Sequence, residues 1–219
     1  MPAFTLHGFP GSTNSDRVRL TLAEGGFTDF EFQIVDLLKG KHRSEEYLKV
    51  NPWGKVPAIT YPNGFTLYES QAICKHLATK YSFPLLPSPS DIEGSAVFDQ
   101  AACVLDAYFT EPSAKISIEK FVKPKMLQLP TDEAAVSEAV KSLGGFFDVQ
   151  EHLLKKGGYM AGEQFSLVDI YYIPAILRLF TLGYEDLVRD RPAVGSWWDR
   201  CMGRPAVQAW IAAGKKATA

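Results

Sequence analysis

The sequence is most informative in one stretch, Asn51-Pro52-Trp53-Gly54-Lys55-Val56-Pro57, which is followed twelve residues later by Glu69-Ser70. This order predicts a turn, a short apolar strand, a hairpin at Asn63-Gly64, a second short strand and then a helix. Proline at the start of a strand removes a ladder donor and is unusual there, and a cis Val56–Pro57 bond is one arrangement that would make it useful. Such a bond leaves the backbone groups of Val56 free to pair with an added strand. The stretch therefore predicts a site for a small peptide.

Composition places the chain among ordinary globular proteins. It has 219 residues, of which 46% are apolar and 22% charged, enough for one large domain or two small ones. The formal net charge is −2 and no basic block is present, so nucleic acid is not an expected partner. No apolar run is long enough to cross a bilayer, and no membrane association is expected.

The N-terminus and the cysteines indicate a cellular compartment. Met1-Pro2-Ala3-Phe4 lacks the basic and apolar regions of a secretory signal. Three cysteines are scattered through helical patterns, which favours a reduced cytoplasmic protein over a disulfide framework. The four histidines do not cluster with them, so no metal site is expected.

Two differently patterned parts follow one another along the chain. Residues 1–81 predict strand, helix, strand, a short helix, two strands joined by a hairpin, and a helix, which is a βαβ-ββα order. Residues 82–93 are rich in proline and serine and are expected to be a linker. Residues 94–219 are almost wholly helical in pattern.

One helix of the second part has a clear start signal. Ser166 and Asp169 have the spacing of a capping box, and Phe165 and Ile170 that of a hydrophobic staple. The helix that follows, expected over Leu167–Phe180, is apolar on most sides. It is therefore predicted to be the buried centre of an all-helical domain, with Ser166 and Asp169 as structural residues.

Together these features resemble the cytosolic glutathione transferases, and within them the serine-using phi class. The resemblance covers essentially the whole chain. It rests on Gly8-Phe9-Pro10-Gly11-Ser12-Thr13 before Arg17-Val18, Gly40-Lys41-His42-Arg43, the 51–57 stretch, Leu67-Tyr68-Glu69-Ser70-Gln71-Ala72-Ile73, Ala107-Tyr108-Phe109 with Pro112, and Phe121-Val122-Lys123-Pro124. Each segment alone is weak, but all of them in order are specific.

The resemblance implies a fold and an activity. The fold is α/β plus all-α, with a thioredoxin-like βαβ-ββα domain at residues 1–81, a linker at 82–93 and an all-helical domain at 94–219 that contributes a hydrophobic substrate site. The activity is conjugation of the glutathione thiolate to small hydrophobic electrophiles, with reduction of organic hydroperoxides as a second reaction. Glutathione is the co-substrate, no cofactor is permanently bound, and the protein is expected to be a cytoplasmic homodimer.

Two other functions remain open on the same scaffold. A non-catalytic ligandin would carry hydrophobic molecules without turnover. A structural assembly module is the third alternative, and the intact glutathione positions argue against it.

Ser12 is the expected catalytic residue. An unperturbed thiol has a pKa of about 8.5, so the protein has to favour the thiolate at neutral pH. A hydroxyl near a helix N-terminus can do so by donating a hydrogen bond to sulfur. Ser12 precedes a helix expected over residues 16–25. A plain loop or N-cap serine is the alternative; Thr13 is the second candidate donor, and Ser15 is expected to be the cap.

The resemblance also assigns the glutathione-binding residues. Glu69 and Ser70 are expected to hold the γ-glutamyl end, although an acid and a serine at a helix start are also ordinary capping residues. Basic side chains are expected at the glycyl carboxylate, where a solvated basic loop is the alternative. Lys55 departs from the glutamine usual in the phi class. The complete expected set is His42, Arg43, Lys55, Val56, Pro57, Glu69 and Ser70.

The expected electrophile pocket is apolar and lies between the domains. An apolar helical stripe is more often core than pocket, so this assignment has an alternative for each helical residue. The candidates are Phe9, Gly11, Leu37, Leu38, Tyr108, Phe109, Pro112 and Ile116.

Related branches of the family place other residues at the catalytic position. Thiol-transferase and dehydroascorbate-reductase branches carry a cysteine where this chain has Ser12, and Cys74 is expected to be structural. Tyrosine-using branches place a tyrosine near position 7, where this chain has His7, an expected packed strand residue. Conjugation is therefore favoured over thiol exchange.

Overall fold

A computed structural model of the protein describes residues 1–217, with side chains through residue 213. It contains two compact units. The first comprises Met1–Pro84 together with the C-terminal helix α10 (Pro205–Ala217), and the second comprises Leu85–Gly203. This division differs from the expected one, which placed the C-terminal residues in the helical domain.

Helix α10 belongs to the first unit because of its contacts. It packs against α1 (Thr13–Glu24), and Arg204, just before α10, forms a 2.7 Å ion pair with the buried carboxylate of Glu24. Helical patterning cannot reveal such an assignment, since a helix looks the same in sequence whichever unit its apolar face covers.

The first unit has the thioredoxin-like βαβ-ββα order that the sequence predicts. The elements are β1 (Thr5–Gly8), α1, β2 (Glu31–Ile34), the 3-10 turn η1 (Lys41–Arg43), α2 (Glu45–Leu48), β3 (Ala58–Thr60), β4 (Thr66–Tyr68) and α3 (Ser70–Lys80).

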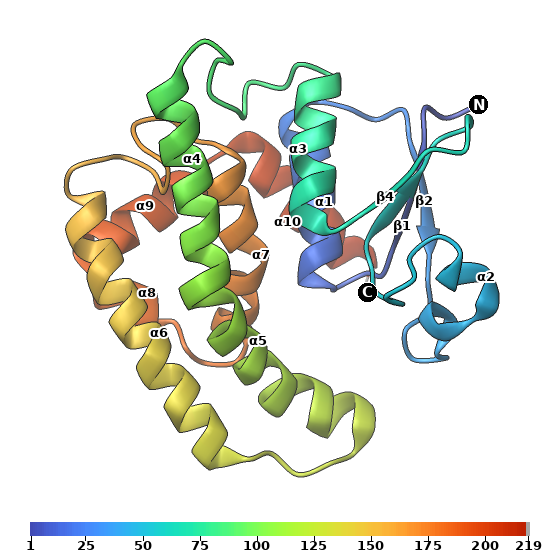
Figure 1. The fold of residues 1–219 in the computed structure, drawn as a ribbon. Coiled ribbons are helices and arrows are strands. Elements are labelled where there is room, and N and C mark those ends of the chain that lie inside the picture. Colours follow the sequence, from blue (N-terminus) through green and yellow to red (C-terminus); the bar gives the residue numbers. More distant parts are fainter. Residues whose placement is uncertain (218–219) are drawn as a thin grey trace. The chain divides into compact units, whose positions relative to one another are not determined.

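The four strands form one mixed sheet in the order β2-β1-β3-β4. Strand β1 pairs parallel with β2 and antiparallel with β3, and β3 pairs antiparallel with β4. Leu6 and Ile59 face each other across β1 and β3 with no exposed surface. Helices α1 and α3 lie side by side against the sheet (Figure 1).

The predicted hairpin at Asn63-Gly64 is confirmed. Gly64 has φ +85°, a left-handed conformation that glycine adopts at low cost. Its N–H donates to the carbonyl of Tyr61, and the N–H of Tyr61 donates to Phe65, both at 2.9 Å. The turn thereby sets the register in which β4 leads to the N-terminus of α3.

The second unit is all-helical, as predicted. Its elements are α4 (Ile92–Val104), the π-helical segment η2 (Leu105–Thr110), α5 (Glu111–Ser117), a second π-helical segment η3 (Ile118–Leu127), α6 (Glu133–Leu154), α7 (Leu167–Thr181), α8 (Asp186–Arg189) and α9 (Pro192–Met202). Figure 1 shows α4 and α5 as one continuous rod, with α6 and α7 beside it.

Helix α7 is the buried centre that its apolar sequence predicts, with Ile170, Ile173 and Ile176 fully covered. Its predicted capping box is confirmed: Ser166 caps the helix, and Asp169 Oδ2 accepts the Ser166 N–H at 2.8 Å. Phe165 and Ile170, the expected staple pair, are both buried.

Two sequence-based exclusions concern membranes and disulfides. In the part of the chain that the structure describes, no helix combines the length and the apolarity needed to cross a bilayer. Cys74 and Cys201 are buried free thiols, and Cys103 is an exposed one.

Candidate functional site in the first unit

The loop that follows β1 delivers Ser12 to the start of α1. Gly11 has φ +79°, which allows the chain to reverse there, and the Ser12 N–H donates to the carbonyl of Phe9 at 3.0 Å. Helix α1 then begins at Thr13, with Ser12 as its N-cap. The prediction that Ser15 is the cap is wrong, because the helix begins three residues earlier than residue 16.

Ser15 instead stabilises the loop that precedes α1 through a hydrogen bond of its side chain. It is fully buried, and its hydroxyl accepts a hydrogen bond from the Phe9 N–H at 3.3 Å. The loop that carries Ser12 is therefore held at both of its ends by hydrogen bonds.

The Ser12 hydroxyl has one hydrogen bond, and in that bond it is the acceptor. Its oxygen receives the Ser15 N–H at a long 3.4 Å, and among the described residues nothing accepts its hydroxyl hydrogen. The side chain is half-buried, so it remains reachable. A serine at this place can cap the helix and still donate to an anion, which the N-terminal end of the helix dipole also favours.

The predicted cis peptide bond between Val56 and Pro57 is present. The turn before it is fixed by two side chains that converge on one atom: the Asn51 amide and the Tyr47 hydroxyl both donate to the Lys55 carbonyl at 2.7 Å. The sequence assigns this role to neither residue, since the pairing of the Tyr47 hydroxyl with a carbonyl eight residues away is a tertiary contact.

The backbone of Val56 is available for pairing. Within the described residues, its N–H and carbonyl make no hydrogen bond to the protein backbone. Its side chain is buried with Val35 and Tyr47, which fixes the direction of the free backbone edge. A short extended peptide can pair with such an edge.

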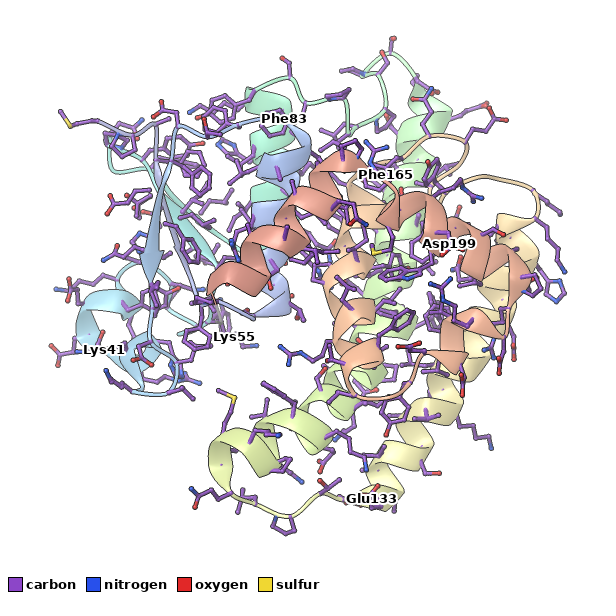
Figure 2. All side chains as sticks on the ribbon, turned by 180° about the vertical axis from the view of Figure 1, so that it is seen from behind. Lys41, Lys55, Phe83, Glu133, Phe165 and Asp199 are labelled. Carbon is purple, nitrogen blue, oxygen red and sulfur yellow. The ribbon has the colours of Figure 1, made fainter. Side chains whose placement is uncertain are left out.

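Basic side chains gather on the lobe formed by η1 and α2. Gly54 has φ +57°, and a Cβ there would lie 2.7 Å from the His42 carbonyl, so the two loops touch at a position that only glycine tolerates. Arg43 donates to the Trp53 carbonyl at 3.4 Å. The contact places His42 and Arg43 near the loop of Lys55, and Figure 2 shows Lys41 and Lys55 on this lobe.

His42 also has an unsatisfied atom. Its Nδ1 is buried and has no hydrogen-bond partner among the described residues. Together with the exposed Arg43 and Lys55, it gives the lobe donors for a carboxylate.

The N-terminus of α3, in contrast to the basic lobe, presents an exposed acidic side chain. Glu69 is exposed and has φ +70°, a strained conformation for a residue with a side chain. Ser70 is buried, and the guanidinium of Arg17, only 6% exposed, donates to its hydroxyl at 3.4 Å. A carboxylate, a helix N-terminus and a buried cation thus meet in one place, which suits a ligand with both an ammonium and a carboxylate.

Arg17 is a buried cation beside the candidate site that sequence reasoning missed. In the sequence it stands out only as part of the Arg17-Val18 signature. The available signal was an arginine at a position where the helix pattern places buried residues, next to Val18.

Two other titratable groups of the unit have structural surroundings. His7 packs in β1 as predicted, its Nε2 lies 2.8 Å from the Thr60 hydroxyl, and burial lowers the pKa of its ring. Burial raises the pKa of the Cys74 thiol to about 12, so this cysteine stays protonated and inert at neutral pH.

The expected hydrophobic-pocket residues fall into three groups. Phe9 and Leu37 are partly buried against the cluster of Val35, Tyr47 and Val56. Gly11, Leu38 and Tyr108 are exposed. Phe109, Pro112 and Ile116 are buried in the second unit.

Phe109 belongs to the core of the second unit. It has no exposed surface, and its ring lies 4.8 Å from that of Tyr172 and 5.4 Å from that of Phe146. The structure therefore favours the core alternative for this helical stripe.

All of the predicted glutathione residues belong to the first unit, where Arg17 contacts Ser70, and Tyr47 and Asn51 hold the Lys55 carbonyl. Among the described residues, no group of three or more histidine, cysteine or acidic side chains has the arrangement of a metal site. An acid and a buried cation at the start of α3, basic side chains near residue 55 and a free backbone edge at Val56 are groups suited to a zwitterionic peptide with a second carboxylate.

Comparisons with known proteins agree along the chain. The family model described as the glutathione S-transferase N-terminal domain matches residues 6–88, and the C-terminal domain model matches residues 113–205. "Glutathione S-transferase PARB" from Nicotiana tabacum is 33% identical over 213 residues, which cover 95% of this chain and 96% of the relative.

Solved structures give the same result. Glutathione transferase F7 from Populus trichocarpa has a TM-score of 0.90 at 30% identity, covering 96% of this chain and 98% of that one. Glutathione S-transferase I from maize, in complex with an atrazine glutathione conjugate, has a TM-score of 0.88 at 33% identity, covering 97% and 98%.

Proposed function

Because the chain belongs to the glutathione S-transferase family and is similar to its phi class, we propose that it conjugates glutathione to small hydrophobic electrophiles, with Ser12 stabilising the thiolate. The observation that carries the role of Ser12 is its hydroxyl hydrogen, which no described residue accepts. The Ser15 N–H donates to the Ser12 hydroxyl oxygen, and the hydroxyl hydrogen of Ser12 remains available to donate to a thiolate.

The first step lowers the pKa of the bound thiol. A hydrogen bond to a charged group contributes about 1.5–3 kcal/mol, and one pKa unit corresponds to about 1.4 kcal/mol. The Ser12 bond therefore accounts for a shift of about 1–2 units. From an ordinary value of about 8.5, this shift makes the thiolate abundant at neutral pH.

The remaining residues hold the tripeptide. Val56 pairs with the cysteinyl backbone through its N–H and carbonyl, which make no hydrogen bond to the backbone of the described residues. Glu69 attracts the γ-glutamyl ammonium, while Ser70, supported by Arg17, receives its carboxylate. The three basic residues His42, Arg43 and Lys55 bind the glycyl carboxylate, and a lysine at position 55 serves as a point charge in place of an amide.

The chemistry needs no permanently bound cofactor. With an aryl halide, the thiolate sulfur forms a bond to carbon, and the halide leaves with the electron pair of the broken bond. With an isothiocyanate, sulfur adds to the central carbon and nitrogen takes up a proton. With an organic hydroperoxide, two glutathione molecules supply two electrons, and the products are glutathione disulfide, an alcohol and water.

The test uses wild type, Ser12→Ala and the control Thr13→Ala. Glutathione affinity is measured by calorimetry, the pKa of the bound thiol by thiolate absorbance, and turnover with an aryl halide, an isothiocyanate and cumene hydroperoxide. We expect Ser12→Ala to retain glutathione binding, to raise the thiol pKa by about 1–2 units and to slow conjugation, while Thr13→Ala does neither.

The same experiment separates the alternatives. Binding of hydrophobic molecules with no turnover on any of the three substrates favours the ligandin function. Turnover that is unchanged in Ser12→Ala overturns the role of Ser12 and leaves the family activity standing. Homodimer formation and a cytoplasmic location complete the proposal, and light scattering on the purified protein and cell fractionation test them.

A further inference from the structure

Two buried side chains hold one peptide unit beside the glutathione residues. The Tyr47 hydroxyl, on α2, and the Asn51 carboxamide, in the turn that follows, each donate to the Lys55 carbonyl oxygen at 2.7 Å. Tyr47 is 6% exposed and Asn51 is 1% exposed. A carbonyl oxygen has two lone pairs, so these two donors use its whole acceptor capacity.

The peptide unit held in this way carries the N–H of Val56. The Lys55–Val56 bond is trans, and a trans peptide unit is planar with its C=O and N–H pointing in opposite directions. An oxygen fixed by Tyr47 and Asn51 therefore directs the Val56 N–H away from both side chains. That N–H makes no hydrogen bond to the described backbone, so it is available to a ligand. Hydrogen bonds to the oxygen also polarise the peptide unit and strengthen its N–H as a donor.

The Tyr47 side chain is itself fixed. Its ring is buried in a cluster with Val35 and Val56. Its N–H donates to the Ser44 hydroxyl oxygen at 3.3 Å, and its carbonyl accepts the Asn51 N–H at 2.9 Å. The hydroxyl is thus in place before any ligand binds, which lowers the entropic cost of binding.

The two donors differ in what else they do. The Asn51 carboxamide also accepts the Trp53 N–H at 3.1 Å, so replacing it would disturb the turn as well as the carbonyl. The Tyr47 hydroxyl has a single hydrogen, which it gives to Lys55. Burial raises the pKa of Tyr47 above its ordinary value of 10, so this hydrogen stays in place at neutral pH. Removing the Tyr47 hydroxyl is therefore the more selective change.

We propose that Tyr47 is a positioning residue of the transferase site: its hydroxyl aims and polarises the Val56 N–H, which donates to the cysteinyl carbonyl of glutathione. The inference rests on the proposed function. Tyr47 acts through the Lys55–Val56 peptide unit and not on the thiol, where Ser12 acts. Loss of its hydroxyl should therefore weaken glutathione binding and leave the chemical step unchanged.

Tyr47→Phe removes the hydroxyl and keeps the ring. Steady-state kinetics with an aryl halide give KM for glutathione and kcat, and thiolate absorbance gives the pKa of the bound thiol. We expect KM to rise about fivefold, the effect of one lost hydrogen bond. At saturating glutathione, kcat should stay within about twofold of wild type, and the thiol pKa should not move. A purely structural role would lower the active fraction, and hence kcat, without changing KM.

Tyr61→Phe is the matched control. Tyr61 is another buried tyrosine of the first unit, 8% exposed, and its hydroxyl lies 3.1 Å from His76 Nε2. Thermal melts show how much stability each variant loses. The control should keep the wild-type KM for glutathione, because its hydroxyl has no contact with the Lys55–Val56 peptide unit.

A change in the ligand tests the contact itself. Calorimetry compares S-methylglutathione with its thioamide analogue, in which sulfur replaces the cysteinyl carbonyl oxygen. Sulfur is the weaker acceptor, so wild type should bind the thioamide less tightly. The ratio of the two affinities should be closer to one in Tyr47→Phe, because the Val56 N–H is no longer aimed at the acceptor. In wild type, the amide proton resonance of Val56 should shift on binding S-methylglutathione and shift less with the thioamide, a test that needs no variant.

Three outcomes would overturn the role of Tyr47. These are an unchanged KM in Tyr47→Phe, an equal rise of KM in Tyr61→Phe, or the same loss of affinity for the thioamide in wild type and Tyr47→Phe. In each case wild type still binds glutathione and turns over the aryl halide, so the proposed function stands. A wild-type protein that does not bind S-methylglutathione would overturn both.

Discussion

Helices α1 and α7 both begin at a serine cap, yet the hydroxyls of Ser12 and Ser166 have different partners. Ser166 is buried, accepts the Val168 N–H at 3.2 Å and donates to Asp169 Oδ2 at 3.2 Å. Ser12 is half-buried, accepts at 3.4 Å and donates to no described residue. The N-cap serine of α7 therefore both accepts and donates a hydrogen bond within the protein, whereas the N-cap serine of α1 only accepts one.

The third residue of each helix explains the difference. In α7 it is Asp169, whose carboxylate receives both the N–H and the hydroxyl of Ser166. In α1 the third residue is Ser15, whose hydroxyl oxygen accepts a hydrogen bond from the Phe9 N–H and none from Ser12. A cap without an acid at the third position keeps its hydrogen, and that hydrogen is what thiolate stabilisation needs.

Helix α6 shows an intermediate arrangement. Asp132 is its cap, and the Asp132 N–H donates to Glu119 Oε2 at 2.9 Å. The acid here comes from the preceding helical segment instead of from the third helical residue, which is Ala135. Tertiary structure thereby completes a capping box that the local sequence lacks.

Replacing Asp169 should have the largest effect. Asp169→Ala leaves the Met160 N–H and the buried Ser166 N–H and Trp197 Nε1–H without their acceptor, which costs on the order of 3–5 kcal/mol of unfolding free energy. Urea unfolding measures it. Asp148→Ala, which removes an exposed carboxylate paired with Arg191, should cost less than about 1 kcal/mol. Equal losses in the two variants would contradict the comparison.

Replacing Ser12 should affect rate more than stability. Ser12→Ala removes a donor to the thiolate, worth about 1.5–3 kcal/mol, so kcat/KM for an aryl halide should fall roughly 10–100-fold. The loss of the cap costs about 1 kcal/mol of stability. Ser12→Thr retains the hydroxyl and should recover most of the rate. A rate loss that only tracks unfolding would make Ser12 an ordinary cap.

Replacing Ser166 should give the reverse pattern. Ser166→Ala removes a cap and one of the two donors to Asp169 Oδ2, at a cost of about 1–2 kcal/mol. Steady-state kinetics well below the melting temperature should show kcat/KM for the same aryl halide within about twofold of wild type. A large rate defect in the folded variant would break the distinction between the two caps.

The smallest predicted effect depends on pH. The Lys123 ammonium beside Glu119, and then the Asp132 N–H, hold the pKa of the Glu119 carboxyl below its ordinary value of 4.5. A lowered folded-state pKa means that the carboxylate stabilises the protein above pH 4.5, and that this contribution disappears as pH falls through the folded-state pKa.

Thermal melts from pH 7 to pH 3 test this dependence. Glu119→Gln should melt at a lower temperature than wild type at pH 7, and the gap should narrow in acid. Glu133→Gln, at an exposed acid paired with Lys120, is the control and should show little gap at any pH. A constant gap for Glu119→Gln would mean that packing, not charge, is responsible.

Local signals in the sequence correctly predicted several features of the molecule. The Val56–Pro57 cis bond, the Asn63-Gly64 hairpin and the Ser166–Asp169 box each depend on residues a few positions apart. The order of elements in the first unit follows from the same local patterns. Short-range backbone preferences and side-chain hydrogen bonds decide such features, so they can be read without knowing the fold.

The features that were missed involve distant residues. The capping of α1 by Ser12 goes with the Ser15 hydroxyl accepting the Phe9 N–H, and the burial of Phe109 goes with its contacts to Phe146 and Tyr172. The role of Arg17 depends on Ser70, 53 positions away.

By itself, the sequence determined which elements form, the family they belong to and which residue types are present for binding a charged tripeptide. Only the tertiary structure decided which serine caps α1, which cation supports α3 and which carbonyl receives the Tyr47 hydroxyl and the Asn51 amide. The physical reason is that hydrogen-bond capacity belongs to a residue, whereas its satisfaction depends on neighbours that the chain brings together only when it folds.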